Sequence, residues 1–414
     1  MKRRISLPAA AIAALLIAAF AAAPALAGTC DTMRSRLLRG GGSASGLLVV
    51  DAESGRTLCA RAPGRALPLA SNMKMFTTAA ALSLLGPEHR IPTKLFATGP
   101  IDAEGTLHGD LYLRGGGDPM LGTPAFYGRY FGGLGTNLLA LRRQVVAAGI
   151  EKVEGRLYAD DTIFDRLRGV ADSGYATSSY IGPLSGLAFN AGFASSSARS
   201  FASDPGKLAA AQLARTLRAG GVRVPARVAL APTPLNAERI GVLKSPPLDP
   251  IVNTTNVYSV NFLAEMLIKL LGAQFGSGGT TAAGAKVVAD FAARTGSGVH
   301  AVDGSGLTRT NRGSPRQVVD LLLGMREDPA GEEFIQDLAL TGREGTVANR
   351  TEGTAAYGRC RTKTGTLTGV SALSGYCFNR SGRIVVFSIL MASVGSLDLA
   401  HYEQDRIAAA VASY

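Results

Sequence analysis

Histidine is scarce in this 414-residue chain, and its placement excludes several kinds of catalysis. The four histidines are far apart: His89, His108, His300 and His401. None of them forms a closely spaced pair of the kind that holds a metal, and no Gly-x-Ser-x-Gly turn accompanies them. We therefore expect no catalytic metal, no serine–histidine–aspartate triad and no cofactor.

Long apolar runs are also absent after the first 27 residues. Lys2, Arg3 and Arg4 precede an apolar stretch over residues 9–23, and residues 25–27 read Ala-Leu-Ala, as a signal-peptide cleavage site does. A membrane anchor is the alternative, but the stretch is shorter than the ~20 residues that a spanning helix needs. We predict a signal peptide over residues 1–27 and an exported protein, periplasmic or otherwise extracytoplasmic, with peripheral membrane contact or none.

Basic residues outnumber acidic ones without being clustered. When the three basic residues of the predicted leader are removed, 40 basic and 31 acidic residues leave a formal charge of +9. This balance suits contact with an anionic surface. Because the positive residues are scattered and no recognition motif accompanies them, we do not expect a nucleic-acid partner. The run Gly115-Gly116-Gly117-Asp118 also lacks the Lys-Ser/Thr that completes a phosphate-binding loop.

Cysteine is limited to an even number of residues, which favours disulfides in an oxidising compartment: Cys30, Cys59, Cys360 and Cys377. Cys360 and Cys377 are equidistant from the centre of a predicted hairpin at Thr368/Gly369, so they would face each other and could form a bridge. Two free buried thiols are the alternative. The sequence leaves open whether Cys30 pairs with Cys59.

Apolar periodicity, glycine and proline predict an α+β protein whose antiparallel sheet is flanked by helices. We expect a glycine/serine hinge at residues 40–46. Strands are expected at residues 47–50, 57–61, 111–113, 155–159, 361–365, 371–378 and 384–392. Helices are expected at residues 71–85, 138–148, 207–219, 261–271, 282–295 and 315–325 and after residue 398.

The change in character near residue 92 and the Pro246-Pro247 pair near its end indicate an insertion. We predict one domain from residues 28–91 and 246–414, interrupted by one or more β-rich accessory domains at residues 92–245. A single core is improbable for the 387 residues that remain after cleavage.

Three short motifs, in this order along the chain, predict an acyl-transfer site. Each alone arises by chance in a chain of this size, so the argument depends on the ordered set. The motifs are Ser71-x-x-Lys74, Ser259-x-Asn261 and Lys363-Thr364-Gly365.

The first motif supplies a nucleophile and its base. Ser71 and Lys74 lie three residues apart at the start of a predicted helix, where such residues share a face. Lysine can remove the serine proton once burial, or a second cation such as Lys363, lowers its pKa. The N–H groups of Ser71 and Thr366 would bind the oxyanion. The alternative reading is that Ser71 only caps a helix and that both lysines are structural.

The other two motifs supply groups for the substrate. Ser259 is suited to pass a proton to a leaving amine, and the Asn261 amide can hold a substrate carbonyl or the Lys74 ammonium. Lys363, together with the hydroxyls of Thr364 and Thr366, would bind a carboxylate. Gly365 would let a substrate backbone approach the strand edge.

This motif set resembles that of penicillin-binding proteins and serine β-lactamases. More narrowly, the chain resembles the low-molecular-mass class C penicillin-binding proteins, which are D-alanyl-D-alanine carboxypeptidases and endopeptidases. The likeness covers most of the mature chain and is carried by Leu69-Ala70-Ser71, residues 113–121, Ser245-Pro246-Pro247-Leu248, residues 303–307 and residues 361–367. The interval of 188 positions from Ser71 to Ser259 also matches that family, which has extra domains there, better than a compact β-lactamase.

The resemblance implies a penicillin-binding transpeptidase-like fold and an acyl-enzyme on Ser71. It implies cleavage of D-Ala-D-Ala or D-Ala-diaminopimelate bonds in peptidoglycan stem peptides and crosslinks, and covalent binding of β-lactam antibiotics. Asp160 lies where the family contacts a substrate amino group, although a turn-capping aspartate is an equal alternative. Val260 stands where relatives carry a polar residue, which leaves substrate preference open.

Two other functions remain possible from the sequence. A serine β-lactamase would share the acylation step, although no separate deacylating carboxylate can be assigned. A catalytically inactive cell-wall scaffold would retain the pocket without turnover. The sequence does not decide between carboxypeptidase and endopeptidase preference, nor does it give the oligomeric state.

Overall fold

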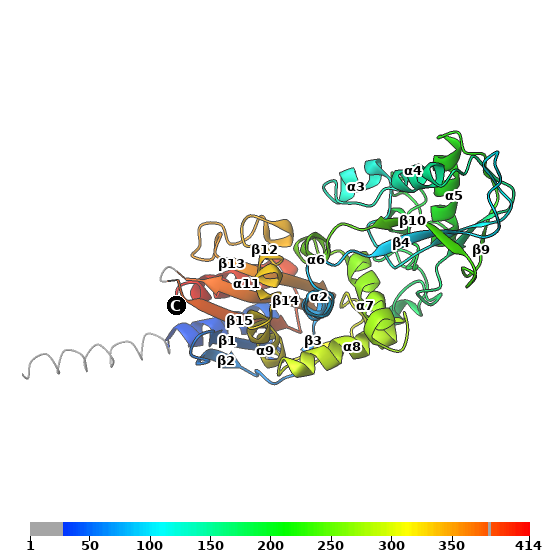
Figure 1. Ribbon diagram of the computed structural model, residues 1–414. Helices are drawn as coiled ribbons and strands as arrows, with labels where there is room; N and C mark the ends of the chain where they lie inside the picture. The colour runs from blue at the N-terminus through cyan, green and yellow to red at the C-terminus, as the bar shows by residue number, and fades with distance from the viewer. Residues whose placement is uncertain (1–27, 380–381) are drawn as a thin grey trace, which may run out of the picture.

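A computed structural model describes residues 28–379 and 382–414 of the chain. The predicted signal peptide lies outside the described residues. Figure 1 shows an elongated molecule in which one sheet lies near the two ends of the described chain and a second sheet lies at the far end. No helix within the described part is long and apolar enough to cross a membrane.

A six-stranded antiparallel sheet unites the two ends of the chain, because β1 pairs with β15. The order of the strands across the sheet is β12-β13-β14-β15-β1-β2. Their bounds are β1 (Gly46–Asp51), β2 (Thr57–Arg61), β12 (Ala339–Leu340), β13 (Cys360–Leu367), β14 (Val370–Phe378) and β15 (Ile384–Met391).

Helices cover both faces of this sheet. Alternate residues of β1 serve the two faces: Leu48 and Val50 belong to the apolar cluster of α2 (Met73–Leu85), α8 (Thr281–Arg294) and α9 (Pro315–Arg326). Leu47 and Val49 belong to the cluster of α11 (Leu397–Val411) and a helix over residues 28–41. Residues 73–82 of α2 are all buried, as expected for a helix enclosed by packed neighbours.

The second sheet has five strands in the order β10-β4-β6-β8-β9, all within residues 92–244. These strands are β4 (Pro92–Ala97), β6 (Leu111–Arg114), β8 (Leu157–Asp160), β9 (Val228–Leu230) and β10 (Glu238–Lys244). Helices α4 (Leu139–Ala147) and α5 (Pro205–Arg218) share an apolar cluster with it. The remaining elements are α3 (Pro124–Tyr130), α6 (Leu248–Val257), α7 (Asn261–Phe275), α10 (Gly331–Gln336) and the short pairs β3 (Leu67–Pro68) with β11 (Arg312–Gly313) and β5 (Thr106–Leu107) with β7 (Lys152–Val153).

The predicted glycine hinge at residues 40–46 is wrong in its first part. Gly40 and Gly41 end the helix over residues 28–41, and β1 begins at Gly46. A side chain at Gly41 would come within 2.5 Å of Met391. The glycines therefore allow this helix to pack closely on β15, instead of providing flexibility.

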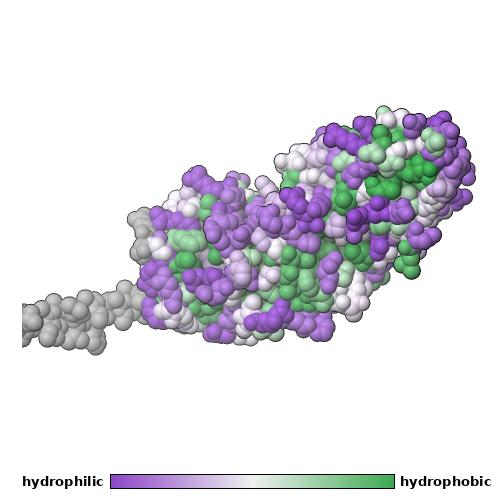
Figure 2. Space-filling model, viewed as in Figure 1, coloured by the Kyte–Doolittle hydropathy of each residue, from purple (hydrophilic) through white to green (hydrophobic). Residues whose placement is uncertain are grey.

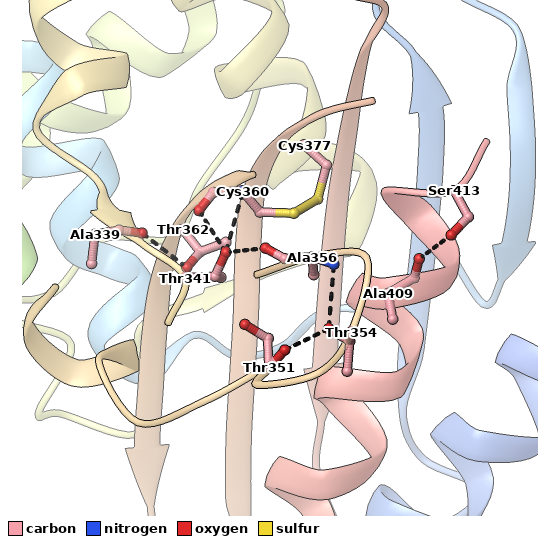
Figure 3. Close-up of a disulfide and its surroundings, with 10 residues drawn as sticks. All are labelled: Ala339, Thr341, Thr351, Thr354, Ala356, Cys360, Thr362, Cys377, Ala409 and Ser413. Carbon is pink, nitrogen blue, oxygen red and sulfur yellow. Dashed lines mark hydrogen bonds between the residues drawn. A yellow bond between two sulfur atoms is a disulfide. The ribbon is translucent and has the colours of Figure 1, made fainter. Parts of the chain in front are cut away.

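Both pairs of cysteines form disulfides. Cys360 and Cys377 are directly opposed in the register of β13 and β14, with Cα atoms 4.0 Å apart, which confirms the predicted bridge. Figure 3 shows that Thr341 binds the same strand: its hydroxyl donates to the carbonyl oxygens of Ala356 and Cys360, and the Cys360 N–H donates to that hydroxyl. Cys30 and Cys59 also pair, which settles the question that the sequence left open.

Hydrophilic residues cover much of the face shown in Figure 2, and hydrophobic residues lie between them in separate patches over both ends of the molecule. This distribution is ordinary for a folded surface, on which many apolar atoms remain exposed. The interior carries the more informative polar groups, because several buried side chains that can ionise lie around α2 and α7.

Candidate active site

Ser71 is held on a short 3-10 turn, Ala70–Asn72, that leads directly into α2. The turn is fixed to the sheet by the Asn72 amide, which donates to the Lys363 carbonyl oxygen at 2.9 Å. The Asn72 amide oxygen accepts a hydrogen bond of 2.7 Å from the Ser374 hydroxyl on β14. Ala70 adopts a φ of 47°, a left-handed conformation that costs an alanine energy. These contacts hold the serine at a fixed place beside β13.

Lys74 places its ammonium group between the first two motifs. Its Nζ lies 3.0 Å from Ser71 Oγ and 2.7 Å from Asn261 Oδ1. A third hydrogen bond, of 2.7 Å, goes to the carbonyl oxygen of Ser305. With three acceptors around it, the amine is oriented toward the serine hydroxyl whose proton it would receive.

Burial lowers the pKa of both lysines of the site. Lys74 is fully buried, and the loss of hydration lowers its pKa to about 7, against the opposing attraction of Glu265 and Asp303. Lys363 is also fully buried, and burial together with the charge of Lys74 lowers its pKa well below the usual range. A lysine with a pKa of about 7 is partly neutral at neutral pH and can act as a base.

The second motif lies at the start of α7. Asn261 is the first residue of the helix, where its amide oxygen meets Lys74 and its amide nitrogen donates to the Tyr180 carbonyl oxygen at 3.1 Å. Ser259 precedes it with a φ of 58°, which is rare for a serine and often marks a functional position. The backbone therefore turns at Ser259, and Val260 leads into α7. Both Ser259 and Asn261 line the cavity.

The third motif lies along β13 where this strand extends beyond its short neighbour β12. Phe378 N donates to Arg359 O, so the alternation of an antiparallel ladder places Thr364 and Thr366 in non-hydrogen-bonded pairs. Their backbone N–H and C=O groups thus point away from β14, toward the open edge. This geometry makes the Thr366 N–H available to an oxyanion or a substrate strand.

A cavity of about 330 Å³ joins these groups. Six of the predicted residues line it: Ser71, Ser259, Asn261, Thr364, Gly365 and Thr366. Lys74 and Lys363 do not line it but lie buried next to the residues that do. A Cβ on Gly365 would come within 3.1 Å of Ser71 N, so the strand passes directly beside the serine.

Three further lining residues were not predicted from the sequence: Thr346, Arg350 and His401. The Thr346 hydroxyl accepts a 2.8 Å hydrogen bond from the Thr364 hydroxyl. Arg350 pairs with Asp405 at 2.8 Å. Burial, and then the charge of this arginine, lower the pKa of His401. No motif connects these positions, because they come together only when α11 packs on β14 and β15.

Asp160 lies at the end of β8 and not among the residues that line the cavity. Its carboxylate accepts hydrogen bonds from the backbone N–H and hydroxyl of both Thr162 and Thr233, at 2.5 to 3.1 Å. These bonds connect β8 to the segment after β9. They match the turn-capping alternative, and contact with a substrate stays a prediction.

The described residues contain no group of three or more histidine, cysteine, aspartate or glutamate side chains that could hold a metal ion. Around the cavity, the reactive and polar groups come from serine, threonine, asparagine, arginine and histidine side chains, and Lys74 is buried against Ser71.

Comparison with known proteins identifies the relatives of this arrangement. The model of the D-Ala-D-Ala carboxypeptidase 3 (S13) family matches residues 34–203 and 194–412. The chain belongs to this family. It is 32% identical to a D-alanyl-D-alanine carboxypeptidase of Actinomadura sp. (strain R39), over 90% of this chain and 82% of the relative. Membership makes it a serine carboxypeptidase-type hydrolase and confirms the resemblance inferred from the motifs.

Two further similar proteins extend the comparison. The carboxypeptidase DacB of Mycolicibacterium smegmatis is 29% identical, over 84% of this chain and 76% of the relative. The crystal structure of penicillin binding protein 4 from Haemophilus influenzae superposes with a TM-score of 0.76 at 20% identity, covering 92% of this chain and 99% of that one. The structural match confirms the predicted α+β penicillin-binding fold.

Proposed function

We propose that this S13 protein is an exported serine DD-peptidase of the cell wall. It cleaves D-Ala-D-Ala or D-Ala-diaminopimelate bonds in peptidoglycan stem peptides and crosslinks, and it is acylated by β-lactams at the same serine. The observation that carries the proposal is that Lys74 Nζ lies 3.0 Å from Ser71 Oγ while burial lowers the lysine pKa to about 7.

In the first half of the reaction, Ser71 Oγ attacks the carbonyl carbon of the scissile bond and its proton passes to Lys74 Nζ. The Ser71 and Thr366 N–H groups bind the oxyanion. Ser259 transfers a proton from Lys74 to the departing amine, after which the C–N bond breaks. The Asn261 amide keeps Lys74 in place throughout, as its 2.7 Å hydrogen bond supports.

In the second half, water attacks the acyl-enzyme and gives its proton to Lys74, and Ser71 leaves with a proton. Substrate binding precedes both halves of the reaction. The terminal carboxylate of the intact substrate binds to the hydroxyls of Thr364 and Thr366, beside the charge of Lys363. Asp160 remains the proposed contact for a substrate amino group. No aspartate or glutamate is present among the described residues that line the cavity, which favours a slowly deacylating penicillin-binding enzyme over a β-lactamase.

The setting of the enzyme is part of the proposal. We assign residues 1–27 to a cleaved signal peptide, residues 28–91 and 246–414 to the peptidase domain, and residues 92–245 to an insertion. Two relatives that the chain matches over most of its length carry carboxypeptidase names. A periplasmic or other extracytoplasmic place follows from the substrate, because peptidoglycan lies outside the cytoplasmic membrane.

The test is the intact mass of the mature protein during incubation with benzylpenicillin, beside a Ser71→Ala variant. We expect one long-lived adduct in the native protein and none in the variant, followed by D-alanine release from a muropeptide pentapeptide only in the native protein. Rapid consumption of the drug without a lasting adduct would replace the proposal with a β-lactamase. An intact drug with no adduct would indicate an inactive scaffold.

A further inference from the structure

A buried carboxyl group lies behind the base and is not used by the mechanism described above. Glu265 is fully buried on α7, one helical turn after Asn261. Residues four apart on a helix share a face, so both side chains extend toward the same side. Asn261 touches Lys74 directly, whereas Glu265 reaches it through the backbone of Ser305.

The connection runs through a single peptide turn. Glu265 Oε1 accepts a 2.7 Å hydrogen bond from Ser305 N, and the carbonyl oxygen of the same residue accepts the 2.7 Å hydrogen bond of Lys74. Thr77, one turn along α2 from Lys74, donates to the Gly304 carbonyl oxygen at 2.9 Å. A Cβ on Gly304 would lie 2.5 Å from the Ala264 carbonyl oxygen, so the turn is pressed against α7.

The second carboxyl oxygen is buried without a partner. Glu265 Oε2 has no hydrogen-bond partner among the described residues. An ionised carboxylate in such a place loses hydration without compensation. Burial, and then the charge of Asp303, raise the pKa of Glu265 to about 8. The carboxyl is thus mostly neutral at neutral pH and becomes charged only in alkaline solution.

We propose that Glu265 is a positioning residue for the lysine base: through Ser305 it holds Lys74 against Ser71, and its own charge state determines how readily Lys74 loses its proton. The inference rests on the proposed serine acyl transfer. A neutral carboxyl leaves Lys74 free to be neutral, whereas a carboxylate stabilises the ammonium and weakens the base.

Other ionisable groups that face this pair are included in the expectation. Asp303, in the same turn as Ser305, attracts the Lys74 ammonium and raises the pKa of Glu265. Lys363 on β13 is repelled by the charge of Lys74. Lys269, one turn after Glu265 on α7, is attracted to Glu265, pairs with Asp165 and lies near Arg168.

The sign of the effect follows from the charge. Acylation requires neutral Lys74, so its rate rises with pH through the lysine pKa of about 7. Glutamine at position 265 keeps an acceptor for Ser305 N but never carries a negative charge. Below about pH 7 the native carboxyl is neutral, as glutamine is, so the two profiles coincide there. Where the native carboxylate forms, around pH 8, it stabilises the ammonium, so the native rate reaches its plateau at a higher pH than the Glu265→Gln rate.

The experiment measures the second-order rate constant of acylation by benzylpenicillin from pH 5.5 to 9.5, in the full mature protein. We expect Glu265→Gln to match the native rate at pH 6 and to react about twofold faster near pH 8, where only the native side chain is ionised. Glu265→Ala, which also loses the Ser305 contact, should fall at least about tenfold across the range. Asp337→Asn is the matched control, since Asp337 is likewise a buried carboxyl with an oxygen that has no partner in the described structure.

The outcomes separate this inference from the proposed function. A Glu265→Gln profile that superposes on the native one also above pH 7, or a Glu265→Ala variant that is folded and as fast as Glu265→Gln, would overturn the role of Glu265. An equal change of the rate profile in Asp337→Asn would also overturn it, because the loss of any buried carboxyl would then have the same effect. Failure of the native protein to form any adduct on Ser71 would instead reject the acyl-transfer proposal itself.

Discussion

At the scale of the residue, the site depends on burying two lysines close together. Lys74 and Lys363 are both fully buried, and the charge of Lys74 contributes to the lowered pKa of Lys363. Like charges in a dry environment oppose each other's protonation. The sequence predicted Lys363 as a second cation that could lower the pKa of Lys74, but the motifs alone did not specify that both side chains would be fully buried. The role of Glu265 could not be predicted, since a single glutamate in an apolar helix matches no motif.

Lys363 can be tested by comparing two substrates. Lys363→Ala removes a cation from beside the proposed carboxylate site, so kcat/KM for a peptide ending in a free carboxylate should fall about 100-fold. A neutral thioester that lacks the carboxylate should lose about tenfold or less, because only the effect on Lys74 remains. The measurement is steady-state hydrolysis of both substrates by native and variant protein.

Thr362→Val offers a control on the same strand, because Thr362 is buried and its hydroxyl donates to Ala339 O and not to the cavity. Its kinetics should stay within about twofold of the native protein for both substrates. Equal losses of the two substrates in Lys363→Ala would remove Lys363 from carboxylate binding.

At the scale of the element, local signals predicted most of the described helices and five of the six strands of the first sheet, but not β4, β9 and β10 of the second sheet. Helix α2 ends at Leu85, before the Gly86-Pro87 pair that predicted its end, and α7 begins at Asn261 as expected. The helix over residues 28–41 and α6 were not predicted. In the first case glycines at the end of the helix were interpreted as a hinge. In the case of α6, Pro246 and Pro247 were interpreted as a domain boundary and not as the start of a helix, although proline is tolerated in a first turn.

Gly365 provides the sharpest test of an element. An added Cβ would lie 3.0 Å from the Leu69 carbonyl oxygen and 3.1 Å from Ala70 Cβ and Ser71 N. Gly365→Ala should therefore push β13 away from the serine by a few tenths of an ångström and lower the rate of acylation by at least about tenfold. Because the neighbours need shift only slightly, we expect a loss of folding stability of about 1–2 kcal/mol.

Stopped-flow acylation and thermal unfolding would measure the two quantities separately. Gly369→Ala, at the hairpin turn of the same two strands, is the comparison: its φ of 73° makes a side chain costly, but no atom lies within 4 Å of the added Cβ. It should lose stability without a comparable loss of acylation. A native rate of acylation in Gly365→Ala would contradict the expectation, because β13 would then accommodate a side chain at position 365 without displacing Ser71.

At the scale of the whole molecule, residues 92–245, the predicted insertion, contact residues of the candidate site. The Tyr180 carbonyl oxygen accepts a hydrogen bond from Asn261, and Asp165 forms an ion pair with the buried Lys269 of α7. One apolar cluster also crosses the predicted boundary, since Phe164 and Ile181 pack with Phe262 and Met266. Composition and proline placement predicted an insertion at residues 92–245, which stays a prediction. They could not predict these contacts, because nothing local in the sequence specifies which distant segments meet.

The ion pair between Asp165 and Lys269 tests whether the two parts unfold together. Lys269 is fully buried, whereas Asp165 keeps 22% of its side chain exposed. Asp165→Asn leaves the lysine charge buried without its partner, so the free energy of unfolding should fall by about 2–3 kcal/mol, below the usual cost of breaking a fully buried pair. Calorimetry should show one transition that moves to lower temperature as a whole, and a separate early transition would mean that the insertion unfolds independently.

A double-mutant cycle then isolates the pair itself. Combining Asp165→Asn with Lys269→Met removes both charges, so the double variant should lose clearly less stability than the sum of the single variants, with a coupling of about 1 kcal/mol or more. Lys286 and Asp290 form an exposed pair on α8, with 76% and 55% of their side chains accessible, and the same cycle there should give a coupling near zero. Additive losses at Asp165 and Lys269 would mean that the contact between the insertion and α7 depends on the apolar cluster alone, because the ion pair would then contribute no interaction energy of its own.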